Sequence, residues 1–372
     1  MKVPYIDLAA EYREQEERID AAVKAVLASG NYVLGENVAA FEEEFGSWLG
    51  GAAVAAVNSG TDAIYLVLKA MGIGPGDEVV TVSHTAVNTV LAVSKVGATP
   101  VLVDIEPETF CLDPGLLAGS LTVRTRAIIP VHLYGHPVDM DPVLEAAAER
   151  GIPVIEDCAQ AHGALYRGRM VGTIGAAACF SFYPTKNLGA AGDAGAVASS
   201  DQGLVAKVRS LANCGQGEER YHNVYRGEVS RLDELQAAIL RVKLEALDDA
   251  TGRRRAAAAL YRELLAGLDI ALPLEREWAR HVYHLFVART RDRDGLLEHL
   301  RRAGVGAMVH YPVPVHRQPA YADSFDMALP ETDRAVGEII SLPAYPGITP
   351  AQQEYVAGQI AAFLRGQAPA GS

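Results

Sequence analysis

One lysine of this chain lies where its side chain can be both buried and reactive. Lys186 follows the apolar run 178–182, which is rich in aromatic residues, and precedes a glycine-rich turn at 189–195. Burial favours the neutral amine, and a neutral lysine is a nucleophile that can form a Schiff base with a carbonyl compound. The alternative is a structural lysine that extends its ammonium group into solvent. Because most other lysines fall in segments typical of surface helices, we favour the reactive lysine.

An aspartate follows a second apolar run of the chain. Asp157 comes directly after residues 153–155, within the segment Ile155-Glu156-Asp157-Cys158. Open α/β sheets bind their ligands at the carboxyl ends of the strands, so Asp157 is placed to lie inside a site. A buried carboxylate is costly unless it faces a cation or a hydrogen-bond donor, which points to a protonated ligand. A helix cap is an equally good reading of this segment alone.

A third segment could hold phosphate. Asn58-Ser59-Gly60-Thr61-Asp62-Ala63 follows the apolar run 53–57 and opens a helical pattern. Ser59 can cap that helix, while Gly60 and Thr61 present free backbone N–H groups at the positive end of the helix dipole. Alone, the segment is more typical of an ordinary capped helix. Together, the lysine, the aspartate and the helix terminus match the aldehyde, the pyridine nitrogen and the phosphate of pyridoxal phosphate.

The elements that must position these residues form an α/β pattern. Near-continuous apolar runs alternate with helical segments, which predicts a mostly parallel central sheet with helices on both faces. A helix is expected at 12–27 and another through Phe41 and Phe45. The predicted strands are 53–57, 78–82, 100–103, 127–131, 153–155, 178–182 and 194–198.

A change of pattern near residue 246 predicts a second, smaller domain. We expect a large cofactor-binding domain at 1–245, including an N-terminal helical arm, and a small C-terminal α+β domain at 246–372. Within the small domain the sequence predicts a strand at 281–288 and a helix at 293–302, and its last residues, 366–372, are expected to be disordered. His281 and His284, at the start of that strand, are expected to be structural.

Composition excludes several other classes of protein. The 372 residues are 49% hydrophobic and 21% charged, which argues against disorder. The 33 Lys and Arg against 46 Asp and Glu give a net charge of −13, so neither nucleic acid nor an anionic membrane is an expected partner. The four cysteines have wide spacing without a metal-binding motif, so we expect no metal site and reduced thiols. No signal or membrane-spanning segment is evident, so the cytoplasm is the expected location.

The ordered motifs extend the comparison from single sites to nearly the whole chain. From Pro4 to about Ala362 the sequence resembles the DegT-type family of pyridoxal-phosphate sugar aminotransferases. The resemblance implies the fold type I aminotransferase architecture and a homodimer whose active sites are shared between subunits. It also implies transfer of an amino group from L-glutamate to a nucleotide-linked keto sugar. The motifs are NSGTDA at 58–63, GDEVV at 76–80, GATPV at 97–101, IEDCAQAHGA at 155–164, SFYPTKNLGAAGDAGA at 181–196, SRLDELQAA at 230–238 and VHYPVPVHRQPAY at 309–321.

The resemblance assigns roles to individual residues. Lys186 falls on the Schiff-base lysine, which would also move the proton between the amino-acid Cα and the cofactor C4′, and Asp157 falls on the partner of the pyridine nitrogen. The other implied cofactor-binding residues are Gly60, Thr61, His84, Gln160 and Ser181. The implied substrate-binding residues are Tyr32, Arg231, His310, Tyr311 and His316, with Arg231 assigned to the carboxylate of the amino donor.

Two positions depart from the family pattern. Ala86 stands where relatives often carry an aromatic ring that stacks on the cofactor, so either His84 stacks instead or the ring is covered in another way. Val229 stands where relatives commonly have an asparagine that reaches the cofactor phosphate of the neighbouring subunit. That contact is left without an assigned residue.

The resemblance also ranks the possible reactions. A subgroup with histidine at the lysine position catalyses dehydration, and Lys186 argues against it. SFYPTKNLGA followed by GDAGA is closer to enzymes that aminate C3 of TDP-linked 3-keto-6-deoxyhexoses than to the C4 enzymes, although C4 amination of a UDP- or TDP-4-keto sugar stays open. A non-catalytic regulator that keeps the cofactor fold is a further alternative. A Rossmann dehydrogenase is disfavoured because the sequence lacks GxGxxG.

Overall fold

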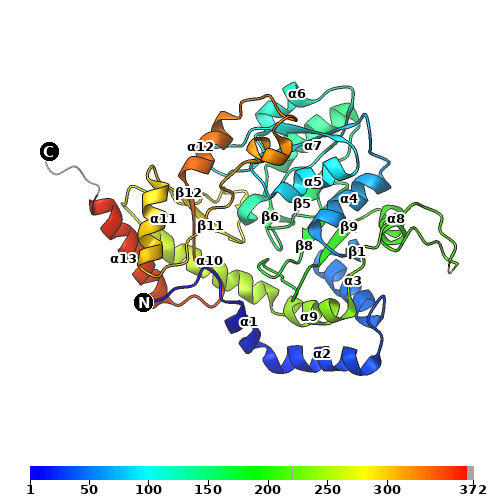
Figure 1. Cartoon of the computed structure of the whole chain (residues 1–372), viewed down its shortest axis with the longest axis horizontal. Helices are drawn as coiled ribbons and strands as arrows, with labels where there is room; N and C mark the ends of the chain where they lie inside the picture. The colour runs from blue at the N-terminus through cyan, green and yellow to red at the C-terminus, as the bar shows by residue number, and fades with distance from the viewer. Residues whose placement is uncertain (220, 367–372) are drawn as a thin grey trace.

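A twisted central sheet forms the larger part of the computed structural model, which describes residues 1–219 and 221–366 (Figure 1). Its strands are β1 (Ala53–Val57), β2 (Glu78–Val82), β3 (Thr99–Val103), β4 (Thr125–Ile128), β5 (Ile155–Asp157), β8 (Ala177–Ser181) and β9 (Gly195–Ser199). They form two blocks, in the orders β3-β2-β4 and β5-β8-β9-β1. Parallel bridges from Ile128 to Val154 and from Val131 to Asp157 join the two blocks.

The predicted parallel sheet is confirmed, with one reversed strand. β2 runs parallel to both β3 and β4, and β5 runs parallel to β8. β9 is the exception, because it pairs antiparallel with both β8 and β1. Every residue of β2 and β9 is buried, as expected for strands covered on both faces.

Helices cover both faces of the sheet. The helices of this part of the chain are α1 (Leu8–Glu14), α2 (Glu16–Ser29), α3 (Glu36–Trp48), α4 (Gly60–Ala70), α5 (Val87–Lys95), α6 (Leu117–Ser120), α7 (Met140–Arg150), α8 (Gln202–Ala212) and α9 (Glu234–Leu244). Side chains alternate along a strand, so Ala178 and Phe180 of β8 join one core with α3 and α7, whereas Ala177 and Cys179 join the other with α4 and α8. The short strands β6 (Leu165–Tyr166) and β7 (Arg169–Met170) form a separate hairpin.

The C-terminal part has a hydrophobic core of its own. Its elements are α10 (Leu247–Leu264), β10 (Ala279–Arg280), β11 (Phe286–Arg289), α11 (Arg293–Arg302), α12 (Pro330–Glu338), β12 (Ile339–Leu342) and α13 (Pro350–Gly366). Side chains from α10, β11, α11, β12 and α13 pack together there, and Val3 from the N-terminal arm joins them. This separate core supports the domain division at 245/246, which we retain as a proposal.

Three local expectations differ from the structure. The predicted helix at 12–27 is two helices, α1 and α2, because Gln15 has non-helical dihedral angles and interrupts them. The predicted strand at 281–288 is reduced to β11, because Tyr283 has a φ of 45° and extended pairing cannot pass through it. Of the tail 366–372, Gly366 ends α13, and the rest lies outside the described residues.

Two global expectations concern the cysteines and membranes. All four cysteines are free thiols, and Cys214 alone among them is exposed. None of the described helices combines the length and the apolar character that crossing a membrane requires.

Candidate active site

A cavity of about 570 Å³ opens at the carboxyl ends of the central strands. Five of the residues predicted to bind the cofactor line it: Gly60, Thr61, Asp157, Ser181 and Lys186. They come from the start of α4, the ends of β5 and β8, and the turn after β8. The fold therefore brings together, in one space, residues that lie up to 126 positions apart in the sequence.

Lys186 is held by a tight turn after β8. Its backbone N–H donates to the carbonyl of Tyr183 at 2.8 Å. Gly189 closes the turn, and a Cβ atom there would lie 2.4 Å from the carbonyl oxygen of Pro184, so only glycine fits without a shift. Burial lowers the pKa of the Lys186 amine to about 8, although the negative charge of Asp157 acts in the opposite direction. The amine is therefore much closer to its neutral, nucleophilic form at physiological pH than an exposed lysine is.

Asp157 faces the cavity from the end of β5. Its Oδ2 accepts a hydrogen bond from the Thr89 hydroxyl at 2.9 Å, and its Oδ1 accepts one from the Ala159 N–H at 3.1 Å. Burial nevertheless raises the pKa of this carboxyl group. A protonated ring nitrogen in the cavity would supply the positive charge that a buried carboxylate needs.

The opposite end of the cavity is the start of α4. Ser59 caps the helix by accepting a hydrogen bond from the Asp62 N–H at 3.1 Å, which leaves the N–H groups of Gly60 and Thr61 without partners among the described residues. A Cβ atom on Gly60 would lie 2.7 Å from the Cβ atom of Ser181, so the two backbones meet here at close range. Free N–H groups at the positive end of a helix bind phosphate well.

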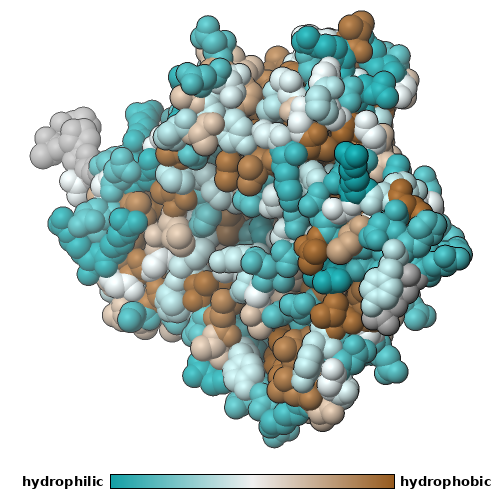
Figure 2. Space-filling view, turned by 45° about the vertical axis from the view of Figure 1, so that its right-hand side comes forward, coloured by the Kyte–Doolittle hydropathy of each residue, from teal (hydrophilic) through white to brown (hydrophobic). Residues whose placement is uncertain are grey.

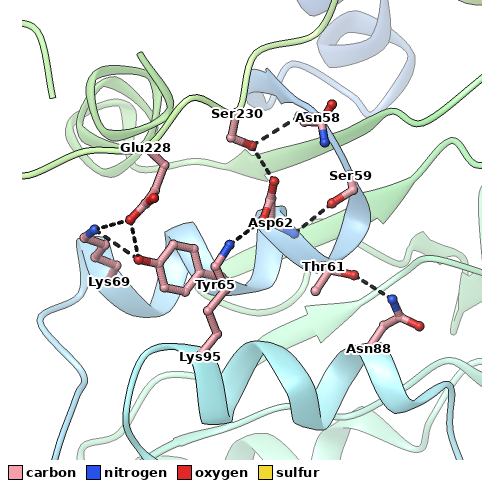
Figure 3. Close-up of polar contacts among 10 residues, drawn as sticks. All are labelled: Asn58, Ser59, Thr61, Asp62, Tyr65, Lys69, Asn88, Lys95, Glu228 and Ser230. Atoms are coloured by element: carbon pink, nitrogen blue, oxygen red, sulfur yellow. Dashed lines mark hydrogen bonds and ion pairs between the residues drawn. The ribbon is translucent and has the colours of Figure 1, made fainter. Parts of the chain in front are cut away.

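A polar network fixes this end of α4 to the chain before α9, as Figure 3 shows. The Ser230 hydroxyl donates to Asp62 at 2.8 Å, and Lys95 forms an ion pair with the same carboxylate at 2.9 Å. Two turns further along α4, Lys69 pairs with Glu228 at 2.8 Å. The two sequence neighbours of Val229, Glu228 and Ser230, therefore both contact α4, while Val229 itself is 70% exposed.

These features fit pyridoxal phosphate. The close approach of Gly60 and Ser181 forms a cradle that any larger residue at position 60 would fill, and its free amides suit the phosphate group. Asp157 would contact the pyridine nitrogen, and Lys186 would hold the aldehyde carbon. When bound, the cofactor supplies an electron sink for charge that develops on an attached amino-acid carbon.

The remaining predicted residues fall into two groups. His310 and Tyr311 line the cavity, and Gln160 reaches it indirectly by donating to the Tyr311 hydroxyl at 3.0 Å. Tyr32, Arg231 and His316 are not among the lining residues of this chain. His316 is buried between Ser83 and Asp333, Arg231 donates to Asn213 at 3.0 Å, and Tyr32 is nearly half exposed.

The structure places Ala86, not His84, at the cavity wall. His84 is fully buried, and its Nε2 lies 2.7 Å from the hydroxyl of Tyr134, which in turn donates to the carbonyl of His310. Burial lowers the pKa of His84 to about 4, so the ring is neutral at pH 7. His84 thus supports the cavity from behind through Tyr134, and direct stacking on the cofactor stays a prediction.

Sequence reasoning gave no functional role to several residues that line the cavity. Arg254 from α10 and Tyr5 from the N-terminal arm both do so. His284, which the pattern predicts as structural, is also a lining residue. Its Nδ1 lies 3.1 Å from Oδ1 of Asn187. The run of three arginines at 253–255 was a visible signal in the sequence, but the residues alone do not show which of them turns inward.

Comparison with known proteins gives a consistent result. The model of the DegT/DnrJ/EryC1/StrS aminotransferase family matches residues 13–361. A Streptomyces venezuelae protein named dTDP-3-amino-3,4,6-trideoxy-alpha-D-glucose transaminase is 47% identical over 348 residues, which are 93% of this chain and 92% of that protein.

Solved structures agree with the sequence match. A crystal structure of DesV from S. venezuelae has a TM-score of 0.95 at 46% identity and covers 98% of both chains. A crystal structure of NtdA from Bacillus subtilis, with bound cofactor PMP, has a TM-score of 0.90 at 33% identity and covers 98% of this chain and 85% of that one. The chain therefore belongs to the DegT/DnrJ/EryC1/StrS aminotransferase family, and pyridoxal phosphate is its cofactor.

Proposed function

We propose that this aminotransferase moves an amino group from L-glutamate to C3 of a TDP-linked 3-keto-6-deoxy sugar. The observation that carries the proposal is the single cavity in which the buried amine of Lys186, the carboxylate of Asp157 and the open start of α4 meet. Amino transfer needs all three: a nucleophilic amine, a partner for the ring nitrogen and an anchor for the phosphate.

In this proposal each residue has a distinct task. Lys186 would hold the cofactor at its aldehyde carbon and, as a free amine, would move a proton between the donor Cα and the cofactor C4′. Its lowered pKa suits both tasks, because the free amine can accept a proton and return it near neutral pH. Asp157 keeps the ring nitrogen protonated, aided by Thr89, which fixes the orientation of the carboxylate.

The choice of sugar rests on the relatives. The S. venezuelae transaminase, 47% identical to this chain, is named for a dTDP sugar with its amino group at C3. This supports a C3 keto group and the TDP nucleotide, and it makes amination at C4 the alternative to be tested.

We also propose a homodimer with shared active sites. Exposed apolar side chains gather on two adjoining loops, before α3 and before α9: Tyr32, Val33, Leu34, Val224, Tyr225 and Val229. A bridge between Val33 and Asp233 holds the loops together. Figure 2, in which the right-hand side of Figure 1 is turned forward, shows several apolar patches on this face of the molecule. Exposed apolar clusters of this kind are typical of subunit interfaces. Light scattering on the purified protein tests the dimer.

The cytoplasm is the location that we propose. The exposed Cys214 and the three buried cysteines are all free thiols, and free thiols persist in a reducing compartment.

Isotope transfer tests the proposed reaction. The holoenzyme is incubated with ¹⁵N-labelled L-glutamate and, separately, with TDP-3-keto, TDP-4-keto and UDP-linked keto sugars, and the products are examined by mass spectrometry. We expect ¹⁵N in the TDP-3-keto sugar product. Label only in a 4-amino sugar would replace C3 with C4, whereas absence of the glutamate half-reaction would favour the non-catalytic regulator.

A further inference from the structure

Three consecutive arginines on α10 have very different surroundings. Arg253 pairs with Glu14 at 2.9 Å and with Asp249 at 3.1 Å. Arg255 pairs with Glu275 at 2.6 Å. Arg254, between them, has no carboxylate within 4.0 Å among the residues that the structure describes. The run therefore holds one guanidinium that no described carboxylate approaches to ion-pair distance.

Arg254 is also the most deeply placed of the three. Its side chain lines the cavity that contains Lys186, and the residue is only 3% exposed. Nη1 donates to the carbonyl of Ala344 at 2.9 Å, while the buried Nε has no hydrogen-bond partner in the described parts of the chain. Burial lowers the pKa of Arg254, and the charge of Glu11 acts against that shift from beyond ion-pair distance. An arginine nevertheless stays charged in proteins.

A buried guanidinium without a carboxylate at ion-pair distance is costly, and its unused donors suit a carboxylate. An anionic ligand in the cavity would relieve that cost. The two candidate anions in the proposed reaction are the carboxylates of the amino donor and the diphosphate of the sugar nucleotide. A diphosphate carries a bulky nucleoside that must extend toward the surface, whereas Arg254 is almost fully enclosed. The small amino donor is therefore the better match.

We propose that Arg254 binds a carboxylate of the amino donor and so determines the specificity for it. This inference rests on the proposed function. It assigns to Arg254 the role that the sequence resemblance gives to Arg231. Arg231 donates instead to Asn213 and does not line this cavity. The keto sugar has no carboxylate, so Arg254 serves the first half of the reaction and not the second.

The test compares Arg254→Gln and Arg254→Lys with Arg253→Gln, a matched control that keeps the neighbouring guanidinium. The first readout is binding of 2-oxoglutarate to the holoenzyme, measured by calorimetry; this acid carries both carboxylates but has no amino group to react. We expect Arg254→Gln to weaken binding about 100-fold, the range of a two-bond contact between charged groups. We expect about tenfold weakening for Arg254→Lys, which keeps the charge but loses the planar fork. Arg253→Gln should stay within about twofold of the parent.

The second readout is the half-reaction with L-glutamate, followed by the cofactor absorbance. Arg254→Gln should raise KM for glutamate by a similar factor, while the reverse half-reaction, started from the amino sugar, should keep its KM. Unchanged 2-oxoglutarate binding in both Arg254 variants would overturn the proposal and leave Arg254 as a structural residue. The same loss in Arg231→Gln, without loss in Arg254→Gln, would return the role to Arg231.

The two proposals fail in different ways. If no keto sugar is aminated, the proposed substrate is wrong, but the binding of 2-oxoglutarate still tests Arg254. If Arg254→Gln does not fold, Arg254→Lys preserves the buried charge and its hydrogen-bond donors, and normal 2-oxoglutarate affinity in that variant would contradict a carboxylate fork.

Discussion

Replacing Glu234 by glutamine should destabilise the protein, although Glu234 does not line the cavity. This residue begins α9, is buried, and caps the start of α3, whose own N-cap residue Gly35 has no side chain. Oε1 accepts hydrogen bonds from the N–H groups of Gly35 at 2.8 Å and Val38 at 2.9 Å. Oε2 accepts from the backbone of Asn37 at 2.9 Å and from its side-chain amide at 3.0 Å.

The expected magnitude follows from this geometry. In Glu234→Gln one oxygen still accepts two hydrogen bonds, but the new NH₂ group can only donate and faces two donors. Losing two hydrogen bonds to a charged acceptor, at about 1.5 kcal/mol each, gives about 3 kcal/mol. The lost negative charge at the start of α3 adds about 0.5 kcal/mol.

Urea unfolding followed by circular dichroism measures this loss. The matched control is Glu245→Gln, which removes an exposed ion pair with Arg18 just after α9 and should change the free energy of unfolding by less than about 1 kcal/mol. Burial acts to raise the pKa of Glu234, but the hydrogen bonds that it accepts from Gly35, Asn37 and Val38 hold that pKa below its ordinary value. Its contribution is thus present above the unfolded pKa, about 4.3, and is lost as pH falls through the folded pKa. Equal stability of the two variants at pH 7 would refute the capping role.

Three further predictions concern the cofactor. Asp157→Asn should lower turnover at least about 100-fold, because the ring nitrogen loses its charged partner, while spectroscopy still shows bound cofactor; normal turnover would exclude that role. Gly60→Ala should weaken cofactor binding to the apoenzyme roughly tenfold, because its Cβ atom would lie 2.7 Å from that of Ser181, and a titration with unchanged affinity would contradict the cradle. The rate at which apoenzyme and cofactor recombine should rise with pH and level off above about 8, where the Lys186 amine is neutral; a rise that continues beyond pH 10 would mean an ordinary exposed lysine.

Much of the sheet could be predicted from the sequence, because its strands are short apolar runs with clear ends. β1 and β2 have the predicted limits, and the limits of the other strands differ from the prediction by one to three residues. The reversal of β9 could not be predicted, since burial on both faces gives the same apolar pattern in parallel and antiparallel strands. The break at Gln15 was also hidden, because the helical periodicity continues through it.

The chemistry of the site was predictable where residue type alone limits the role. A lysine between an aromatic strand and a glycine turn, and an aspartate at a strand end, have few alternative tasks. Arg254 could not be identified in the same way, because the helix period does not show which of three adjacent arginines meets a cavity formed by distant segments. The role of Glu234, the Glu of SRLDELQAA, could not be identified from its residue type either. The structure shows that Glu234 caps the start of α3.

Borohydride reduction of the holoenzyme, followed by peptide mass spectrometry, tests the central claim most directly. The reagent reduces any imine between cofactor and protein to a secondary amine, which does not hydrolyse. We expect one peptide with the added mass of the reduced cofactor, modified at Lys186. Modification at another lysine, or no modified peptide from fully loaded enzyme, would contradict it.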